Sequence, residues 1–391
     1  MKKFTIIIIL AYILLTLNTH TNSENLNKDK ENNKILKIGV IVPLTGEFKQ
    51  IGQSVLKAIQ LAVLELNESK IHIYPKDNKN NVYNTYQAAK ELDDLGVKIV
   101  IGPIFFENLE KLSEINNITF ISLTNKTENL PKNIISFGIN IKSQLEAITN
   151  YLSNKNITKT ILLLPESEFT NQIQPIVQNH KFKFFKTFSY NTDPIKITKE
   201  IEKITNYKQR KINLRARIKK LEKSDLEKDK RELEKLKQLY TLGEVNFKSV
   251  VIADFGESLK SVLASFTFAD VSNEDVKFFA FNQWFDESLF NDKSFQNLIF
   301  PGVDLDNFNK FNEKYFKVFG ELSTEISILA YDAVALIYLT WRDNDEHFKT
   351  EKLSNKTTFK GLHGEFVIKN NISNQKLNIY KIFEKEFVKI N

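Results

Sequence analysis

The most constraining feature of this sequence is the alternation of short apolar runs with amphipathic segments from residue 35 onward. Residues 35–42 (ILKIGVIV) are largely β-branched, and residues 52–66 then place apolar side chains at helical spacing. The order repeats, with strand patterns at 71–74, 97–101 and 118–122 and helical patterns at 84–95 and 107–115. Apolar strands alternating with amphipathic helices are typical of a parallel sheet covered by helices.

A second series of the same kind follows a short strand pattern at 134–137. Strand patterns lie at 159–164, 182–188, 249–253, 277–281 and 298–300, helical patterns at 142–152, 168–179, from 257, 307–319 and 325–341, and a β-rich tail at 363–390. The 391 residues suffice for two domains of ~100–200 residues each. The sequence therefore predicts an α/β protein of two Rossmann-like parallel-sheet lobes joined by a hinge. We expect residues 35–141 and 302–358 in lobe one, and 142–301 and 359–391 in lobe two.

Residues 194–241 interrupt lobe two with apolar residues at alternating spacings of three and four, which predicts an inserted coiled-coil hairpin. Between Lys196 and Thr241 there are 16 Lys or Arg against 8 acids, a net +8, whereas the whole chain carries +7. The remainder is therefore close to neutral, which argues against a nucleic-acid partner. The hairpin is either a solvated element that stabilises itself or a basic projection that meets an acidic partner or an anionic membrane surface.

The first 23 residues have the order of a secretory signal peptide. Lys2 and Lys3 precede the apolar run 4–17, which is shorter than the ~20 residues of a membrane-spanning helix, and a polar stretch follows. We expect cleavage before Glu24, with an uncleaved anchor as the alternative, and a flexible tether at 24–34. The expected location is the periplasm. No cysteine is present, so we expect no lipoprotein anchor.

The usual signatures of catalysis are missing. The five histidines are scattered without metal-ligand spacing, and the sequence contains no nucleophile elbow, phosphate-binding loop or dinucleotide-binding glycine motif. Asp254 and Glu168 form no spacing that favours an acid and base pair over surface acids. We therefore expect a protein without enzymatic activity, cofactor or metal.

The candidate site consists of the loops at the carboxyl ends of the strands, where ligands of open α/β sheets bind. In lobe one these loops contribute Leu44, Thr45, Gly46, Gly102, Pro103, Ile104, Phe105, Phe106, Ser122, Thr124 and Asn125. In lobe two they contribute Glu168, Phe169, Asp254, Phe255, Asn282 and Trp284.

Two alternatives apply to these residues. The hydroxyls of Thr45, Ser122 and Thr124 either hold an anion or cap the following helix. Phe105, Phe106 and Trp284 are either core or ligand contacts. Because two consecutive phenylalanines cannot both point into one helix face, we expect at least one of the first two to face the site.

From residue 35 onward the order of elements resembles the leucine/isoleucine/valine-binding family of type I periplasmic binding proteins. The segments that carry this resemblance are 39–46 (GVIVPLTG), 100–103 (VIGP) and 120–125 (FISLTN). Further segments resemble penicillin-binding protein activators, which share the fold: 102–108 (GPIFFEN), the basic hairpin, 241–243 (TLG), Trp284, 331–336 (YDAVAL) and 361–366 (GLHGEF).

The resemblance implies one of two functions. The first is regulation of peptidoglycan synthesis through contact with a periplasmic synthase, a penicillin-binding protein. The second is the solute receptor of an ABC transporter for amino acids or related small molecules, whose partner is the permease. In that family small hydroxyl residues follow the Gly-Pro strand end, whereas here Ile104, Phe105 and Phe106 stand there, which favours the first function.

Overall fold

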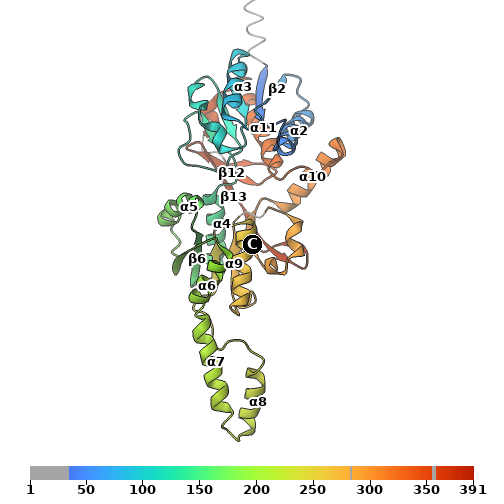
Figure 1. Ribbon diagram of the computed structural model, residues 1–391. Coiled ribbons are helices and arrows are strands. Elements are labelled where there is room, and N and C mark those ends of the chain that lie inside the picture. Colours follow the sequence, from blue (N-terminus) through green and yellow to red (C-terminus); the bar gives the residue numbers. More distant parts are fainter. Residues whose placement is uncertain (1–34, 282–283, 355–357) are drawn as a thin grey trace, which may run out of the picture. The chain divides into compact units, whose positions relative to one another are not determined.

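The computed structural model describes residues 35–281, 284–354 and 358–391. The expected signal peptide at 1–23 and tether at 24–34 lie outside these residues. The described chain divides into two compact units, the first reaching Gly138 and resuming over Lys310–Ser373, the second formed by Ile139–Asn309 and Asn374–Asn391. Figure 1 shows a sheet with flanking helices in each unit.

The first unit is built on an eight-stranded sheet of order β11-β12-β13-β5-β4-β3-β1-β2. Its strands are β1 (Leu36–Val42), β2 (Ile71–Asp77), β3 (Ile99–Ile101), β4 (Thr119–Ser122), β5 (Ile134–Ser136), β11 (Phe359–Lys360), β12 (Glu365–Lys369) and β13 (Ile372–Lys376). Its helical elements are α2 (Lys49–Leu66), α3 (Val82–Asp94), the 3-10 turns η1 (Phe106–Leu109), η2 (Leu112–Glu114) and η5 (Thr350–Ser354), most of α10 (Leu305–Phe319), and α11 (Ser327–Arg342). The strands β1 to β5 pair in parallel, as the sequence pattern predicts.

The second unit has a seven-stranded sheet of order β15-β14-β10-β9-β8-β6-β7. Its strands are β6 (Thr160–Pro165), β7 (Lys186–Tyr190), β8 (Ser249–Ile252), β9 (Lys277–Ala280), β10 (Ile299–Gly302), β14 (Asn378–Phe383) and β15 (Glu386–Lys389). Its helical elements are α4 (Ile141–Asn154), α5 (Glu168–Asn179), α6 (Pro194–Ile204), α7 (Tyr207–Leu221), α8 (Glu227–Leu236), α9 (Gly256–Phe268), η3 (Glu287–Asn291) and η4 (Lys293–Phe295).

Helices cover both faces of the second sheet because its central strands are apolar on both sides. In β6, Ile161 and Leu163 join a core with α6 and α9, while Leu162 and Leu164 join a core with α4 and α5. A strand buried on both faces reads as a continuous apolar run, and residues 160–164 (TILLL) have that character. The two-lobed α/β class predicted from the sequence is confirmed.

The structure corrects the predicted helix at 107–115. Two 3-10 turns stand there instead. The Asn133 amide donates to the carbonyls of Leu112 and Ile115, both at 2.9 Å, so a side chain satisfies groups that helical N–H donors would otherwise reach. This arrangement depends on a residue 18 positions beyond Ile115, which helical periodicity does not reveal.

The boundaries of the insertion and of the tail also differ from expectation. Ile197 and Ile201 of α6 are buried in the lobe core beside α9, so the projecting hairpin is α7 and α8 alone rather than 194–241. Residues 359–373 were expected in lobe two but belong to the first unit, where β11, β12 and β13 continue the sheet next to β5. Residues 302–309 were expected in lobe one but belong to the second unit.

Candidate functional site

The first unit brings the three predicted strand-end loops together at one sheet edge. Parallel pairing places Val40 opposite Ile101 and Ile101 opposite Ile121. The Gly102 N–H donates to the Ile121 carbonyl at 2.8 Å, and Leu123 N–H donates to the Pro103 carbonyl at 3.2 Å. A Cβ on Gly102 would stand 2.1 Å from the Ile41 carbonyl oxygen, and its φ is +107°, so only glycine fits at this crossing.

The hydroxyl groups of Thr45, Ser122 and Thr124, expected either to hold an anion or to cap the following helix, make hydrogen bonds within the unit. Thr45 Oγ1 donates to Asp77 Oδ2 at 2.5 Å, and the buried Ser122 Oγ donates to the Pro103 carbonyl at 2.8 Å. Thr124 Oγ1 accepts from the N–H of Lys126 at 3.2 Å. These hydroxyls therefore stabilise the conformations of the loops. Asn125 and Gly46 lie exposed at the same edge.

Asp77 is a site residue that the sequence analysis missed. Its carboxylate accepts from Leu44 N–H at 2.8 Å and from Lys79 N–H at 2.9 Å, in addition to the Thr45 hydroxyl. Partial burial alone would raise the pKa of Asp77, but the bonds from Thr45, Lys79 and Leu44 outweigh it and hold that pKa below the ordinary 3.8. The signal was present in the sequence: extending the strand at 71–74 to Asp77 puts an acid beside the end of β1, opposite Val42.

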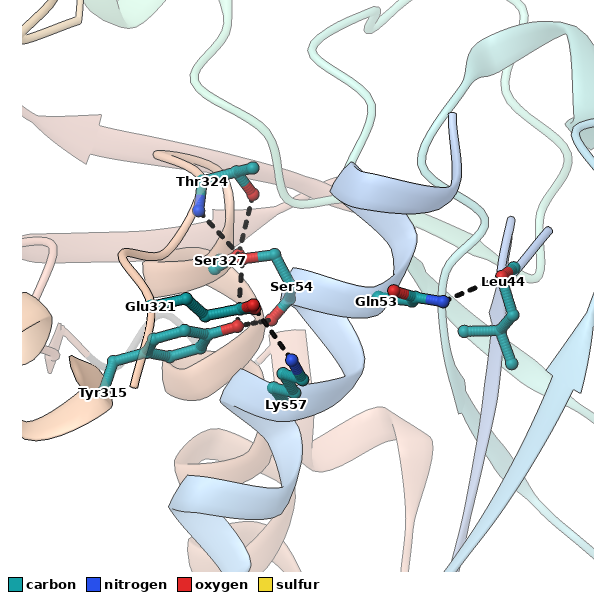
Figure 2. A network of polar contacts seen from close by, with 8 residues as sticks. All are labelled: Leu44, Gln53, Ser54, Lys57, Tyr315, Glu321, Thr324 and Ser327. Carbon is teal, nitrogen blue, oxygen red and sulfur yellow. Dashed lines mark hydrogen bonds and ion pairs between the residues drawn. The ribbon is translucent and has the colours of Figure 1, made fainter. Parts of the chain in front are cut away.

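A polar network holds α2, and with it the first loop. Ser54 Oγ bonds Ser327 Oγ at 2.8 Å and accepts from Thr324 N–H at 2.8 Å, and Lys57 pairs with Glu321 at 2.8 Å. Figure 2 shows how these side chains converge on α2 and how Gln53 reaches the Leu44 carbonyl, a bond of 3.2 Å. The packing of α2 against α11 therefore contributes, together with Asp77, to the position of the Leu44 backbone.

The aromatic residues of the loop after β3 divide between core and edge. Phe106 packs against the core cluster of α3, and Lys126 Nζ lies 4.4 Å from its ring centroid. Phe105 instead contacts Phe48, which precedes α2, with ring centroids 4.7 Å apart, and both rings are half-buried. Ile104 is buried. An apolar pair therefore lies among the predicted loops of this edge.

In the second unit, Asp254 follows the end of β8 and is one of the predicted site residues. The carboxylate is buried and accepts from the Tyr190 hydroxyl, from Ser258 Oγ at 2.5 Å and from Phe255 N–H at 2.8 Å. Burial, followed by the charge of Asp254, raises the pKa of Tyr190 far above its ordinary value. Asp254 therefore acts as a structural acceptor that joins β7, β8 and α9.

The remaining predicted residues of this edge form a second aromatic pair. Phe169 meets Phe255 edge to face at 5.5 Å between ring centroids, and Phe255 is 57% exposed. Glu168 is exposed in the first turn of α5, and Trp284 is half-buried with a φ of +46°. Asn282 lies outside the described residues. Each unit, taken by itself, thus presents a pair of phenylalanines at the carboxyl edge of its sheet.

No group of three or more His, Asp or Glu side chains suitable for a metal ion occurs in the part of the chain that the structure describes. None of the helices within those same residues has the length and apolarity needed to cross a membrane.

The two sheets, their helical layers and the position of the strand-end loops define the type I periplasmic binding protein fold. A family model described as periplasmic binding protein matches residues 35–180. The search of curated proteins gives no match.

Solved structures with this fold include regulators and solute receptors. The C-domain of LpoA (YraM) from Haemophilus influenzae, described as a regulator of PBP1A, is 14% identical with a TM-score of 0.60, over 91% of this chain and 100% of that domain. Leucine-binding protein LivK from Thermotoga maritima is 14% identical with a TM-score of 0.57, over 91% and 98% of the two chains. LivJ from Streptococcus pneumoniae, in complex with isoleucine, is 17% identical with a TM-score of 0.53, over 91% and 100%.

The chain spans only part of full-length LpoA from H. influenzae. It covers 59% of that protein, with 14% identity and a TM-score of 0.62 over 92% of this chain. At these identities the comparisons establish the fold. The proteins they name are binding and regulatory proteins.

Proposed function

We propose that this chain is an exported, non-enzymatic binding protein that regulates a peptidoglycan synthase by direct protein contact in the periplasm. The observation that carries the proposal is the aromatic character of both sheet edges. Phe105 with Phe48, and Phe255 with Phe169, occupy positions among the strand-end loops. Large aromatic side chains are enriched where proteins bind other proteins, and they contribute much of the binding free energy there.

At the same edges, three of the polar side chains that could hold an amino-acid ligand already make hydrogen bonds within their own unit. An amino acid needs donors for its carboxylate and an acceptor for its ammonium group. Thr45 and Ser122 donate within the first unit, and the Asp254 carboxylate already accepts three hydrogen bonds. The LpoA C-domain, described as a regulator of PBP1A, is an example of a regulatory protein with this fold.

A second candidate is a solute receptor for a less polar ligand. One observation favours it. A solute-binding protein from Rhodopseudomonas palustris, with 14% identity and a TM-score of 0.59, was solved in complex with 3,4-dihydroxybenzoic acid. That ligand is aromatic, and pairs of phenylalanine rings can pack against an aromatic ring. The partner would then be a transporter permease.

The experiment measures binding of the mature chain to the class of synthase found in its own cell envelope. We expect Phe105→Ala and Phe255→Ala each to weaken binding at least about tenfold, since truncating an aromatic side chain that a complex buries costs about 1–2 kcal/mol or more. Phe268→Ala is the matched control, because Phe268 at the other end of α9 is 58% exposed and Phe255 is 57% exposed.

Two results would contradict the proposal. One is equal binding by all three variants, and the other is capture of a permease rather than a synthase by the wild-type chain. The export component is measured separately by joining residues 1–23 to a reporter that is active only outside the cytoplasm. A silent reporter that stays in the cytoplasm would rule out the periplasmic location.

A further inference from the structure

The hairpin of α7 and α8 has its positive charge on one helix. The sequence of α7, YKQRKINLRARIKKL, contains seven Lys or Arg and no acid. The sequence of α8, EKDKRELEKL, contains four bases and four acids. The excess charge of the insertion therefore belongs to α7, and the proposed contact with a synthase does not account for it.

Packing against α8 uses one face of α7. Leu214 and Leu221 are buried with Leu236, and Ile218, Leu233 and Leu242 pack against them. Arg217 pairs with Glu232 of α8 through two hydrogen bonds of 2.9 and 2.8 Å. The apolar face of α7 is thus already covered.

Arg210 fixes this helix to the body of the second unit. Its buried guanidinium donates to the carbonyls of Gly243 at 2.8 Å, Ala269 at 3.1 Å and Asp270 at 2.8 Å, and to Thr241 Oγ1 at 2.7 Å. In Figure 1, α7 and α8 extend from the lobe beyond α6. A helix held this way presents its remaining face in a fixed orientation relative to its own unit.

The remaining face is a cationic stripe. Its members are exposed, follow each other at spacings of three, four and four residues, and are Lys208, Lys211, Arg215 and Lys219. Over 11 residues at about 1.5 Å per residue they extend for roughly 16 Å. Lys211 Nζ lies 5.5 Å from the ring centroid of Tyr207, but no ion pair of these four side chains occurs among the described residues, so their charge is available to an external anion. Ile212, 55% exposed, lies among them.

The composition of the stripe identifies the kind of surface that it fits. Three of the four cations are Lys, which is depleted from protein interfaces and binds as a hydrated point charge rather than through a planar fork. A row of such charges suits a surface of diffuse negative charge, and clusters of four or more Lys or Arg are typical of binding to anionic lipid headgroups. Because Leu214, Ile218 and Leu221 of α7 pack against α8, contact is peripheral and the helix does not insert.

We propose that the outer face of α7 docks the protein on an anionic phospholipid bilayer. Each anionic headgroup that approaches a Lys or Arg of the stripe contributes binding free energy. Because Arg210 attaches α7 to the second unit, the bound stripe also sets the orientation of that unit on the bilayer. This contact is independent of the synthase, because it requires only the lipid surface.

The test measures partition of residues 24–391 onto vesicles of phosphatidylglycerol and phosphatidylcholine in equal parts, and onto vesicles of phosphatidylcholine alone. We expect binding only to the first kind, weakening as the Debye length falls from ~10 Å at 0.1 M salt to ~3 Å at 1 M. Replacing Lys208, Lys211, Arg215 and Lys219 by Gln should lower partition at least about a hundredfold, since each charge near the surface contributes roughly fivefold.

The matched control replaces Lys228, Lys230, Arg231 and Lys235 of α8 by Gln, which removes the same three Lys and one Arg. We expect it to lose no more than about fivefold. A second variant, Lys208→Arg with Lys211→Arg and Lys219→Arg, keeps the charge and should bind like wild type. Gln and Arg have helix propensities close to that of Lys, and circular dichroism verifies that each variant folds.

Three outcomes overturn the proposal: wild type that ignores anionic vesicles, equal binding to the neutral vesicles, or equal losses in the α7 and α8 variants. If wild type does not bind vesicles and the α7 variant loses only the synthase, the stripe is a protein contact.

Discussion

Asp77 holds the backbone and hydroxyl of the first strand-end loop, and its hydrogen bonds depend on its charge. The folded pKa of Asp77 lies below the ordinary 3.8. The carboxylate therefore stabilises the loop fully when the pH is above 3.8, and this stabilisation is lost as the pH falls through the folded pKa. Asp77→Asn should therefore lower protection of the Leu44 amide from hydrogen exchange about tenfold at pH 7, or about 1.4 kcal/mol. The difference should shrink as pH falls below 3.8 and through the folded pKa.

The control is Asp94→Asn, which removes a charge from an exposed acid at the end of α3 and should change neither value. A difference between Asp77→Asn and wild type that stays constant with pH would show that shape, not charge, holds the loop.

At the scale of single residues the sequence predicted positions better than roles. Gly102, Ser122 and Phe105 do lie at the edge where strand order places them. The engagement of Thr45 by Asp77 was not predictable from local sequence, because the acid is 32 residues away and lies on the neighbouring strand β2. The same holds for Asp254, whose donor Tyr190 comes from β7.

At the scale of elements, long periodic helices were predicted well and short turns poorly. The predicted helix at 325–341 corresponds to α11 (Ser327–Arg342). Most apolar side chains of α11 are buried, so its sequence is apolar over its whole length and easy to recognise. The segment at 107–115 failed because Asn133 binds its carbonyls from a distance. The hairpin pattern was found, but its start was placed at 194 because α6 continues the same spacing although it packs on the lobe.

Excising the hairpin tests whether it is independent of its lobe. Leu242 N–H donates to the Arg210 carbonyl at 3.0 Å, so the chain ends on either side of residues 211–239 lie close together. A short Gly/Ser linker in place of 211–239 should leave the second unit folded with little change in the exchange of the β8 amides.

Replacing residues 208–239 by the same linker should destabilise the second unit more than replacing 211–239, because the longer excision also removes Arg210. The carbonyls of Gly243, Ala269 and Asp270 then lose a donor, and we expect the second unit to be destabilised by about 1–3 kcal/mol more. Equal stability of both excised proteins would refute this role of Arg210. Failure of the shorter excision to fold would make the hairpin part of the core.

At the scale of the molecule, the sequence predicted two α/β units but assigned the tail to one of them. The chain instead divides its last 33 residues between both sheets, with β11 and β12 beside β13 in the first and β14 and β15 in the second. A buried contact explains why the segment stays with the first unit. Asp332 of α11 accepts from the N–H groups of Leu362 at 2.9 Å and His363 at 2.8 Å, and it pairs with His363 Nδ1 at 2.5 Å.

The two proposed functions also differ in the change of melting temperature that they predict for the whole chain when amino acids are added. If Phe48, Phe105, Phe169 and Phe255 occupy the positions where a receptor holds carboxylate and ammonium groups, none of the standard amino acids should raise the melting temperature. A true ligand at a hundredfold excess over its dissociation constant contributes ~2.7 kcal/mol, which is roughly 5–10 °C for units of this size. S. pneumoniae LivJ with isoleucine is the positive control, since that complex is known. A shift of several degrees with any amino acid would show that the chain is a solute receptor. A regulator that binds its partner through the aromatic edges is not expected to bind a free amino acid.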